Sequence, residues 1–177
     1  FRHGPRDPDV RKVKGHQGRA LEYLAFVMIQ GARLAIDYGE RRIGIAKSDN
    51  SRLIASPVVT LDNSESTGNV YSAIKDIVTE SNAMLVYIGL PLHLSGKESA
   101  SSEKARVFAG ILKQHLPQEI QIRLLDERLT TSSAVGELKN AGLKSSRESI
   151  DQLAAVKILE FALEVERLSG KAAGHEV

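Results

Sequence analysis

Short apolar runs separated by turn residues begin at residue 33 and predict a β-meander. The segments RLAIDY and RIGIAKSD are typical of two strands joined at Gly39, because glycine supplies the positive φ that a tight hairpin turn needs. The segment LIASPVVTL continues as a third strand, and Pro57 within it favours a sheet edge or a bulge. We therefore expect three antiparallel strands between residues 33 and 61.

After the meander the apolar spacing changes, and helices alternate with strands. Apolar residues at positions 70, 73, 74, 77 and 78 share one face of a helix within residues 66–81. The continuous apolar run AMLVYIGL is typical of a strand covered on both faces, and EIQIRLL provides a fifth strand. Further helices are expected over residues 98–115, 130–141 and 147–168, the second of them ending at Gly142.

This order of elements predicts a mixed α/β fold built on a five-stranded sheet. The first three strands are expected to be antiparallel and the later ones parallel, with helices on both faces. The 177 residues, 42% of them hydrophobic, suit one domain with a sizeable core, which we place at residues 28–168. Residues 1–27 are expected to form a flexible N-terminal extension or tail, and residues 169–177 a frayed C-terminal tail.

The amino-acid composition limits the possible partners and metal ligands more than the net charge does. The chain carries +2, but residues 1–27 hold six Lys or Arg against three Asp or Glu, so the remainder carries −1 and is not basic. No stretch approaches the roughly 20 apolar residues that span a bilayer, so we expect a cytoplasmic protein with no membrane partner. Because cysteine is absent, a bound metal needs oxygen or imidazole ligands, which favours Mg²⁺ or Mn²⁺.

Acidic residues stand where strands end, which is where open α/β sheets place their ligands. Asp37 closes the first strand, Asp126 and Glu127 follow the fifth, and Asp151 lies in the first turn of the last helix. Gathered at one edge, these carboxylates repel one another unless a divalent cation lies among them. Two such ions can activate water and stabilise the leaving oxygen of a phosphodiester. The pattern therefore predicts a metal-dependent phosphodiester hydrolase.

Each acidic residue also has a purely structural interpretation. Asp37 can cap the turn at Gly39, and Asp151 can stabilise its helix through the helix dipole. Asp126 and Glu127 point to opposite sides of an extended segment, so one of them can pair with a neighbouring arginine, and Asp126 is the candidate for that role. Which of these two acids is the primary metal ligand stays open.

Four segments together resemble the motifs of one family. LAIDYGERRIGIAKSD, VYIGLPLHLSGKES, LLDERLTT and IDQLAAVKILE are similar, in order and spacing, to motifs of the YqgF/RuvX family of pre-16S rRNA nucleases, also described as Holliday junction resolvases. The resemblance covers residues 33–168 and implies an RNase H-like fold and a cytoplasmic nuclease that acts with Mg²⁺ or Mn²⁺ on structured RNA or branched DNA. It matches Asp37, Glu127 and Asp151 to the family's catalytic acids, and with Asp126 these are the expected metal ligands.

Turn, hydroxyl and basic residues near these acids are expected to contact substrate or to border its cleft. They are Gly39, Arg42, Gly89, Pro91, Lys97, Arg128, Thr130 and Thr131.

The first functional hypothesis is a metal-dependent endonuclease that processes the 5′ end of pre-16S rRNA, with nucleic acid and a pre-ribosomal particle as partners. One alternative is a Holliday junction resolvase, which needs a dimer to cut two strands symmetrically. Another is a non-catalytic ribosome-assembly or nucleic-acid-binding module. Whether the protein is a monomer or a homodimer stays open.

Overall fold

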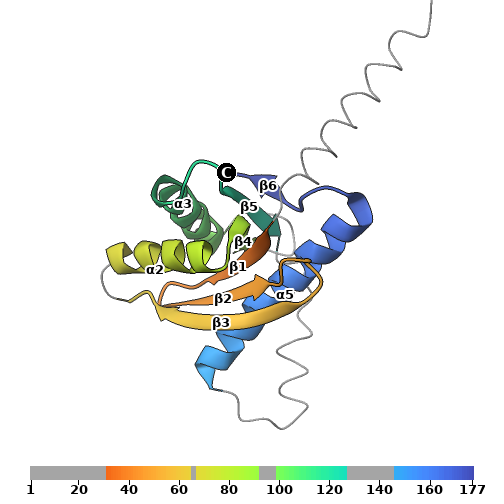
Figure 1. Cartoon of the computed structure of the whole chain (residues 1–177). Helices are drawn as coiled ribbons and strands as arrows, with labels where there is room; N and C mark the ends of the chain where they lie inside the picture. The colour runs from red at the N-terminus through yellow and green to blue at the C-terminus, as the bar shows by residue number, and fades with distance from the viewer. Residues whose placement is uncertain (1–30, 65–66, 92–98, 127–145) are drawn as a thin grey trace, which may run out of the picture.

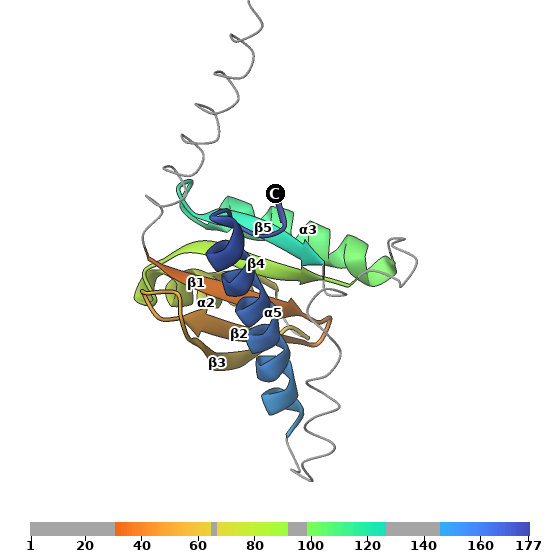
Figure 2. The same cartoon turned by 90° about the vertical axis from the view of Figure 1, so that its right-hand side faces the viewer.

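A six-stranded mixed sheet with helices on both faces forms the centre of the protein (Figure 1 and Figure 2). The computed structural model describes residues 31–64, 67–91, 99–126 and 146–177. The elements are β1 (Ala32–Tyr38), β2 (Arg42–Ser48), β3 (Ala55–Asp62), α2 (Thr67–Glu80), β4 (Ala83–Leu90), α3 (Ala100–His115), β5 (Gln121–Asp126), α5 (Arg147–Ser169) and β6 (His175–Glu176). The strand order is β3-β2-β1-β4-β5-β6.

The predicted meander is confirmed in β1, β2 and β3, and the predicted parallel pairing in β1, β4 and β5. Strand β3 lies at the sheet edge, and its register against β2 shifts between Ile45 and Ala46, the partners of Val59 and Pro57. Pro57 therefore lies at an edge and beside a bulge, where its missing N–H removes no central ladder bond. The helix predicted over residues 130–141, with its end at Gly142, lies outside the described residues.

The sheet has six strands where five were predicted, because the residues expected to fray end in β6. This strand pairs antiparallel with β5. Gly174 adopts φ +66°, and a Cβ there would lie 2.1 Å from the carbonyl oxygen of Leu124, so this position needs glycine. The Arg123 side chain donates to the carbonyl oxygens of Ala173 at 2.6 Å and Gly174 at 2.7 Å, which ties the C-terminal segment to the sheet.

The turn between β1 and β2 is tight, as predicted, but its glycine is needed for a different reason. The N–H of Gly39 donates to the carbonyl oxygen of Arg42 at 2.9 Å. Gly39 is not among the positive-φ residues of the described chain. A Cβ at this position would lie 2.6 Å from the same carbonyl oxygen. The close approach of backbone, not the sign of φ, therefore requires glycine here.

Alternation along the central strands sorts residues between two different faces. Leu34 and Ile36 of β1 are fully buried in the core that helices α2 and α3 cover. Ala35 and Ala46 point to the opposite face, where they pack with residues of α5. Small residues on this second face let α5 approach the sheet closely. None of the helices in the described ranges is long and apolar enough to cross a membrane.

A buried polar cluster fixes the C-terminal end of α5 against the start of β1. Arg33 is fully buried, and its Nε lies 3.0 Å from Oε1 of Glu166. The Tyr87 hydroxyl donates to the same carboxylate oxygen at 2.5 Å and accepts from the N–H of Ala173 at 3.2 Å. Burial, reinforced by the Glu166 charge, raises the pKa of Tyr87. The cluster therefore joins β1, β4, α5 and the C-terminal segment.

Candidate active site

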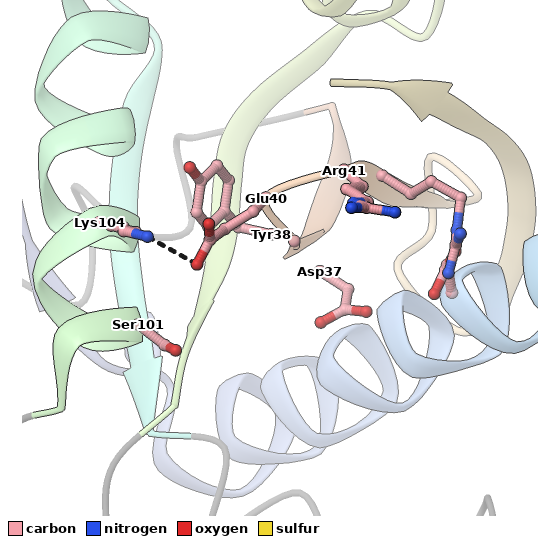
Figure 3. A pocket seen from close by; sticks show the side chains of 9 residues that line it. Asp37, Tyr38, Glu40, Arg41, Ser101 and Lys104 are labelled. Atoms are coloured by element: carbon pink, nitrogen blue, oxygen red, sulfur yellow. Dashed lines mark hydrogen bonds and ion pairs between the residues drawn. The ribbon is translucent and has the colours of Figure 1, made fainter. Parts of the chain in front are cut away.

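Asp37 reaches the α5 face of the sheet because it follows Arg33 and Ala35 in the alternation of β1. It is the penultimate residue of the strand, and its side chain is partly buried. Figure 3 shows its carboxylate pointing away from the β1–β2 turn toward the ribbon of α5. The same strand thus presents Arg33 to the C-terminal end of α5 and Asp37 to the N-terminal end of this helix.

Gly44 of β2 explains how α5 comes close enough to bring Asp151 beside Asp37. Gly44 is the cross-strand partner of Asp37. A Cβ on Gly44 would lie 2.1 Å from the backbone carbonyl oxygen of Asp151, so any side chain here would push the helix away. The helix begins after the N-cap Ser146, whose side chain accepts from the N–H of Ser149. Asp151 is its fifth residue, one position beyond the first turn in which we expected it.

The electrostatics of the two acids differ. Burial, with a further contribution from the negative charge of Asp151, raises the pKa of Asp37 from 3.8 to about 6. Asp151 has a cationic partner, since Nε of Arg42 donates to its Oδ2 at 2.5 Å. This hydrogen bond raises the pKa of Arg42. The ionised form of Asp37 is therefore electrostatically unfavourable in this cleft. A positive charge near its carboxylate would favour that form.

These groups line an open cleft of about 460 Å³ (Figure 3). The β1–β2 turn forms one wall, the start of α3 a second and the start of α5 a third. Arg42 and Asp151 join the turn to α5, and Lys104 and Glu40 join α3 to the turn with an Nζ–Oε1 distance of 2.7 Å. The lining residues are Asp37, Tyr38, Gly39, Glu40, Arg41, Arg42, Ser101, Lys104 and Asp151.

The chemistry of Asp37 and Asp151 fits a hard divalent cation. Carboxylate oxygens from two elements converge on one cleft, where the charge of Asp151 adds to the effect of burial in raising the pKa of Asp37. Within the described residues, however, no group of three or more His, Cys, Asp or Glu side chains could hold a metal. The third predicted acid, Glu127, lies outside those residues. It directly follows β5, which runs parallel to β4, as β4 does to β1.

The remaining predicted site residues divide into three groups. Gly39 and Arg42 line the cleft, and their contact with substrate stays a prediction. Gly89 lies inside β4, Pro91 follows this strand, and Asp126 ends β5. The described residues that line the cleft do not include these three. The predicted contacts that lie outside the described residues are Lys97, Arg128, Thr130 and Thr131.

The cleft wall also includes residues that are not among the predicted site residues. Tyr38, Glu40 and Arg41 lie in or beside the turn that follows Asp37, so proximity along the chain was a usable signal. Ser101 and Lys104 come from α3, where a spacing of three residues places them on one helix face. Nothing local in the sequence indicates that this face meets the turn.

Comparisons with known proteins identify the family and the fold of the chain. A family model described as "RuvX: Holliday junction resolvase" matches residues 31–165. Two relatives bear the name "Putative pre-16S rRNA nuclease". The relative from Clavibacter sepedonicus is 43% identical over 146 residues, covering 81% of this chain and 89% of its own. The one from Streptomyces avermitilis is 41% identical over 152 residues, covering 85% of this chain and 96% of its own.

Among solved structures, "T. thermophilus RuvC in complex with Holliday junction substrate" matches 83% of this chain and 99% of its own, with a TM-score of 0.59 and 12% identity. At this identity the likeness speaks for the fold alone, and it confirms the predicted RNase H-like architecture. The family match and the identities near 40% establish the relationship. The chain belongs to the RuvX family.

Proposed function

We propose that this protein is a metal-dependent endonuclease that hydrolyses phosphodiester bonds at the 5′ end of pre-16S rRNA in the cytoplasm. The observation that carries the proposal is the convergence of Asp37 and Asp151 on one cleft. This cleft lies at the end of the sheet where the parallel strands β1, β4 and β5 have their C-termini. The names of the relatives support RNA as the substrate. Glu127 is assigned as the third catalytic acid because it lies in the segment LLDERLTT, which resembles a motif of the family.

The residues of the chain have separable roles in this proposal. Asp37 and Asp151, with Glu127 and Asp126 as further ligands, would hold Mg²⁺ or Mn²⁺ through carboxylate oxygens. When bound, such ions lower the pKa of water and stabilise charge at the leaving oxygen. Arg42 orients Asp151 through the Nε–Oδ2 hydrogen bond and reduces the repulsion between this acid and Asp37.

The test is cleavage of a labelled transcript that spans the 5′ leader and the start of 16S rRNA, with and without Mn²⁺. We expect the wild type to cut this RNA only with metal, and Asp37→Asn to lose cleavage while its circular dichroism spectrum stays native. Cleavage by Asp37→Asn at the wild-type rate would refute the assignment. Asp76→Asn, at an exposed position of α2, is the matched control.

The second candidate function is resolution of four-way DNA junctions, which the description of the matching family favours. A synthetic junction assayed beside the rRNA transcript separates the two substrates. Symmetric paired cuts in the junction with an uncut transcript would favour the resolvase and a homodimer. Metal-dependent cuts in the transcript alone would favour rRNA processing. Binding of the transcript with no cleavage of either substrate would favour a non-catalytic assembly module.

A further inference from the structure

Helix α3 presents two polar residues to the cleft from a well-anchored position. Ser101 and Lys104 project from the same face of its first turns (Figure 3). The helix begins with a capping box between Ser99 and Ser102, and both hydroxyls also donate to the carbonyl oxygen of Pro91, at 3.2 and 2.8 Å. Because these bonds fix the helix to the end of β4, the base of the Lys104 side chain has a defined place in the cleft that Asp37 and Asp151 also line.

The contact that Lys104 makes in the free protein is easily exchanged. Its Nζ lies 2.7 Å from Oε1 of Glu40, and both side chains are about half exposed. Exposed ion pairs contribute little to stability because water and salt screen them. The hydrogen bond to Glu40 raises the pKa of Lys104, so the ammonium group stays charged. Another anion that enters the cleft can therefore replace Glu40 at small cost.

Among the described residues that line the cleft, two further cations differ from Lys104 in their surroundings. Arg42 is held by Asp151, while Arg41 belongs to the exposed turn. Lys104 is the cation that the α3 wall supplies, opposite the elements that carry Asp37 and Asp151. A nucleic-acid backbone that placed its reactive phosphate near the acids and ran along this wall would bring a neighbouring phosphate to Lys104.

From this arrangement we propose that Lys104 binds a backbone phosphate of the RNA substrate, and that Glu40 holds the ammonium group in the cleft until the RNA replaces it. The inference rests on the proposed function, and it adds a specific binding residue to the cleft. A competing interpretation gives Lys104 only the role of neutralising Glu40, whose negative charge would otherwise repel phosphate. The two interpretations differ in what Lys104 does when Glu40 is absent.

A double-mutant cycle separates these roles. The variants are Lys104→Gln, Glu40→Gln and the combination, and binding of the fluorescein-labelled leader transcript is measured by anisotropy in EDTA, where no metal-dependent cleavage occurs. Affinity is recorded over a range of salt concentrations. Each lost phosphate contact lowers the magnitude of the slope of log K against log salt by about 0.7 to 0.9. For one contact this corresponds to a loss of roughly five- to eightfold in affinity at 0.1 M salt.

We expect Lys104→Gln to lower the slope by one contact, and to do so again in the Glu40→Gln background. Glu40→Gln alone should tighten binding, because it removes an anion from the cleft. Lys104→Arg should keep the slope, since the charge is retained. Lys75→Gln, which removes an exposed lysine from α2, controls for net charge and should leave the slope unchanged.

An unchanged slope in Lys104→Gln, or a loss that disappears in the Glu40→Gln background, would overturn the inference. Metal-dependent cleavage of the transcript by the wild type is measured separately. Wild-type cleavage together with a slope independent of Lys104 would leave the proposed function standing and remove this residue from it. A wild type that neither binds nor cuts the transcript would overturn both.

Discussion

Replacing Asp37 with Asn should stabilise the metal-free protein, although it removes a residue assigned to the active site. The carboxylate is partly buried beside Asp151, and both conditions penalise its charged form. Asparagine has nearly the same shape and no charge. The variant therefore keeps the packing of β1 and loses the electrostatic cost of the site.

The size of the effect follows from the shift in pKa. A change from 3.8 to about 6 costs the folded state about 3 kcal/mol once Asp37 is ionised. Well below pH 3.8 the group is protonated in both folded and unfolded chains, so it contributes no penalty. Between pH 4 and 6 the unfolded chain loses the proton first, and wild-type stability falls as pH rises. Above pH 6 the full penalty is present.

Urea unfolding in EDTA at pH 8 and pH 4 measures this difference. We expect Asp37→Asn to exceed the wild type by about 3 kcal/mol at pH 8, a rise in Tm of roughly 6 to 12 °C, with the difference falling to about 0.5 kcal/mol at pH 4. Asp76→Asn removes a carboxylate from an exposed position of α2 and controls for net charge. Equal stability of Asp37→Asn and wild type at pH 8, or a lower stability of the variant, would refute the reasoning.

Two further predictions test the packing that positions the site. Gly44→Ala should destabilise the protein by about 1–3 kcal/mol, because the new Cβ would meet the backbone of α5. The control Gly110→Ala, whose new Cβ would have no other atom within 4 Å, should stabilise α3 by about 0.5–1 kcal/mol. Glu166→Gln should lower the free energy of unfolding by about 3–5 kcal/mol, because it removes the carboxylate that faces buried Arg33. Glu164→Gln removes a carboxylate from an exposed ion pair and should lower it far less. Urea unfolding checks both, and equal stabilities within either pair would contradict the packing described.

Local sequence patterns predicted most of the strands and helices. They failed for β6, which forms through pairing between segments far apart in the sequence. The alternation of β1 and β2 and the apolar run of β4 are properties of contiguous residues, and the structure confirms these elements. Strand β6 has two residues in a segment of Gly, Ala and polar residues, which carries no periodic signal. It exists because Gly174 and Arg123 bring the chain end against β5, a contact that no local pattern encodes.

The candidate site shows the same division. The position of Asp37 at the end of an apolar strand was enough to mark it, and the place of Asp151 in a helix start was a weaker signal. Their proximity depends on Gly44. A glycine within a strand indicates that another backbone segment approaches closely, but the sequence does not indicate which segment this is. The bridge between Lys104 and Glu40 depends on where α3 lies over the turn, so it could be found only in three dimensions.

The most direct test of the account is whether Asp37 and Asp151 share one metal site. Electron paramagnetic resonance of free Mn²⁺, titrated with the protein at pH 8, measures binding without any nucleic acid. We predict that the wild type and Asp76→Asn bind Mn²⁺ alike, and that Asp37→Asn and Asp151→Asn each bind at least about tenfold more weakly. Wild-type affinity in both active-site variants, or no Mn²⁺ binding by the wild type, would contradict the account.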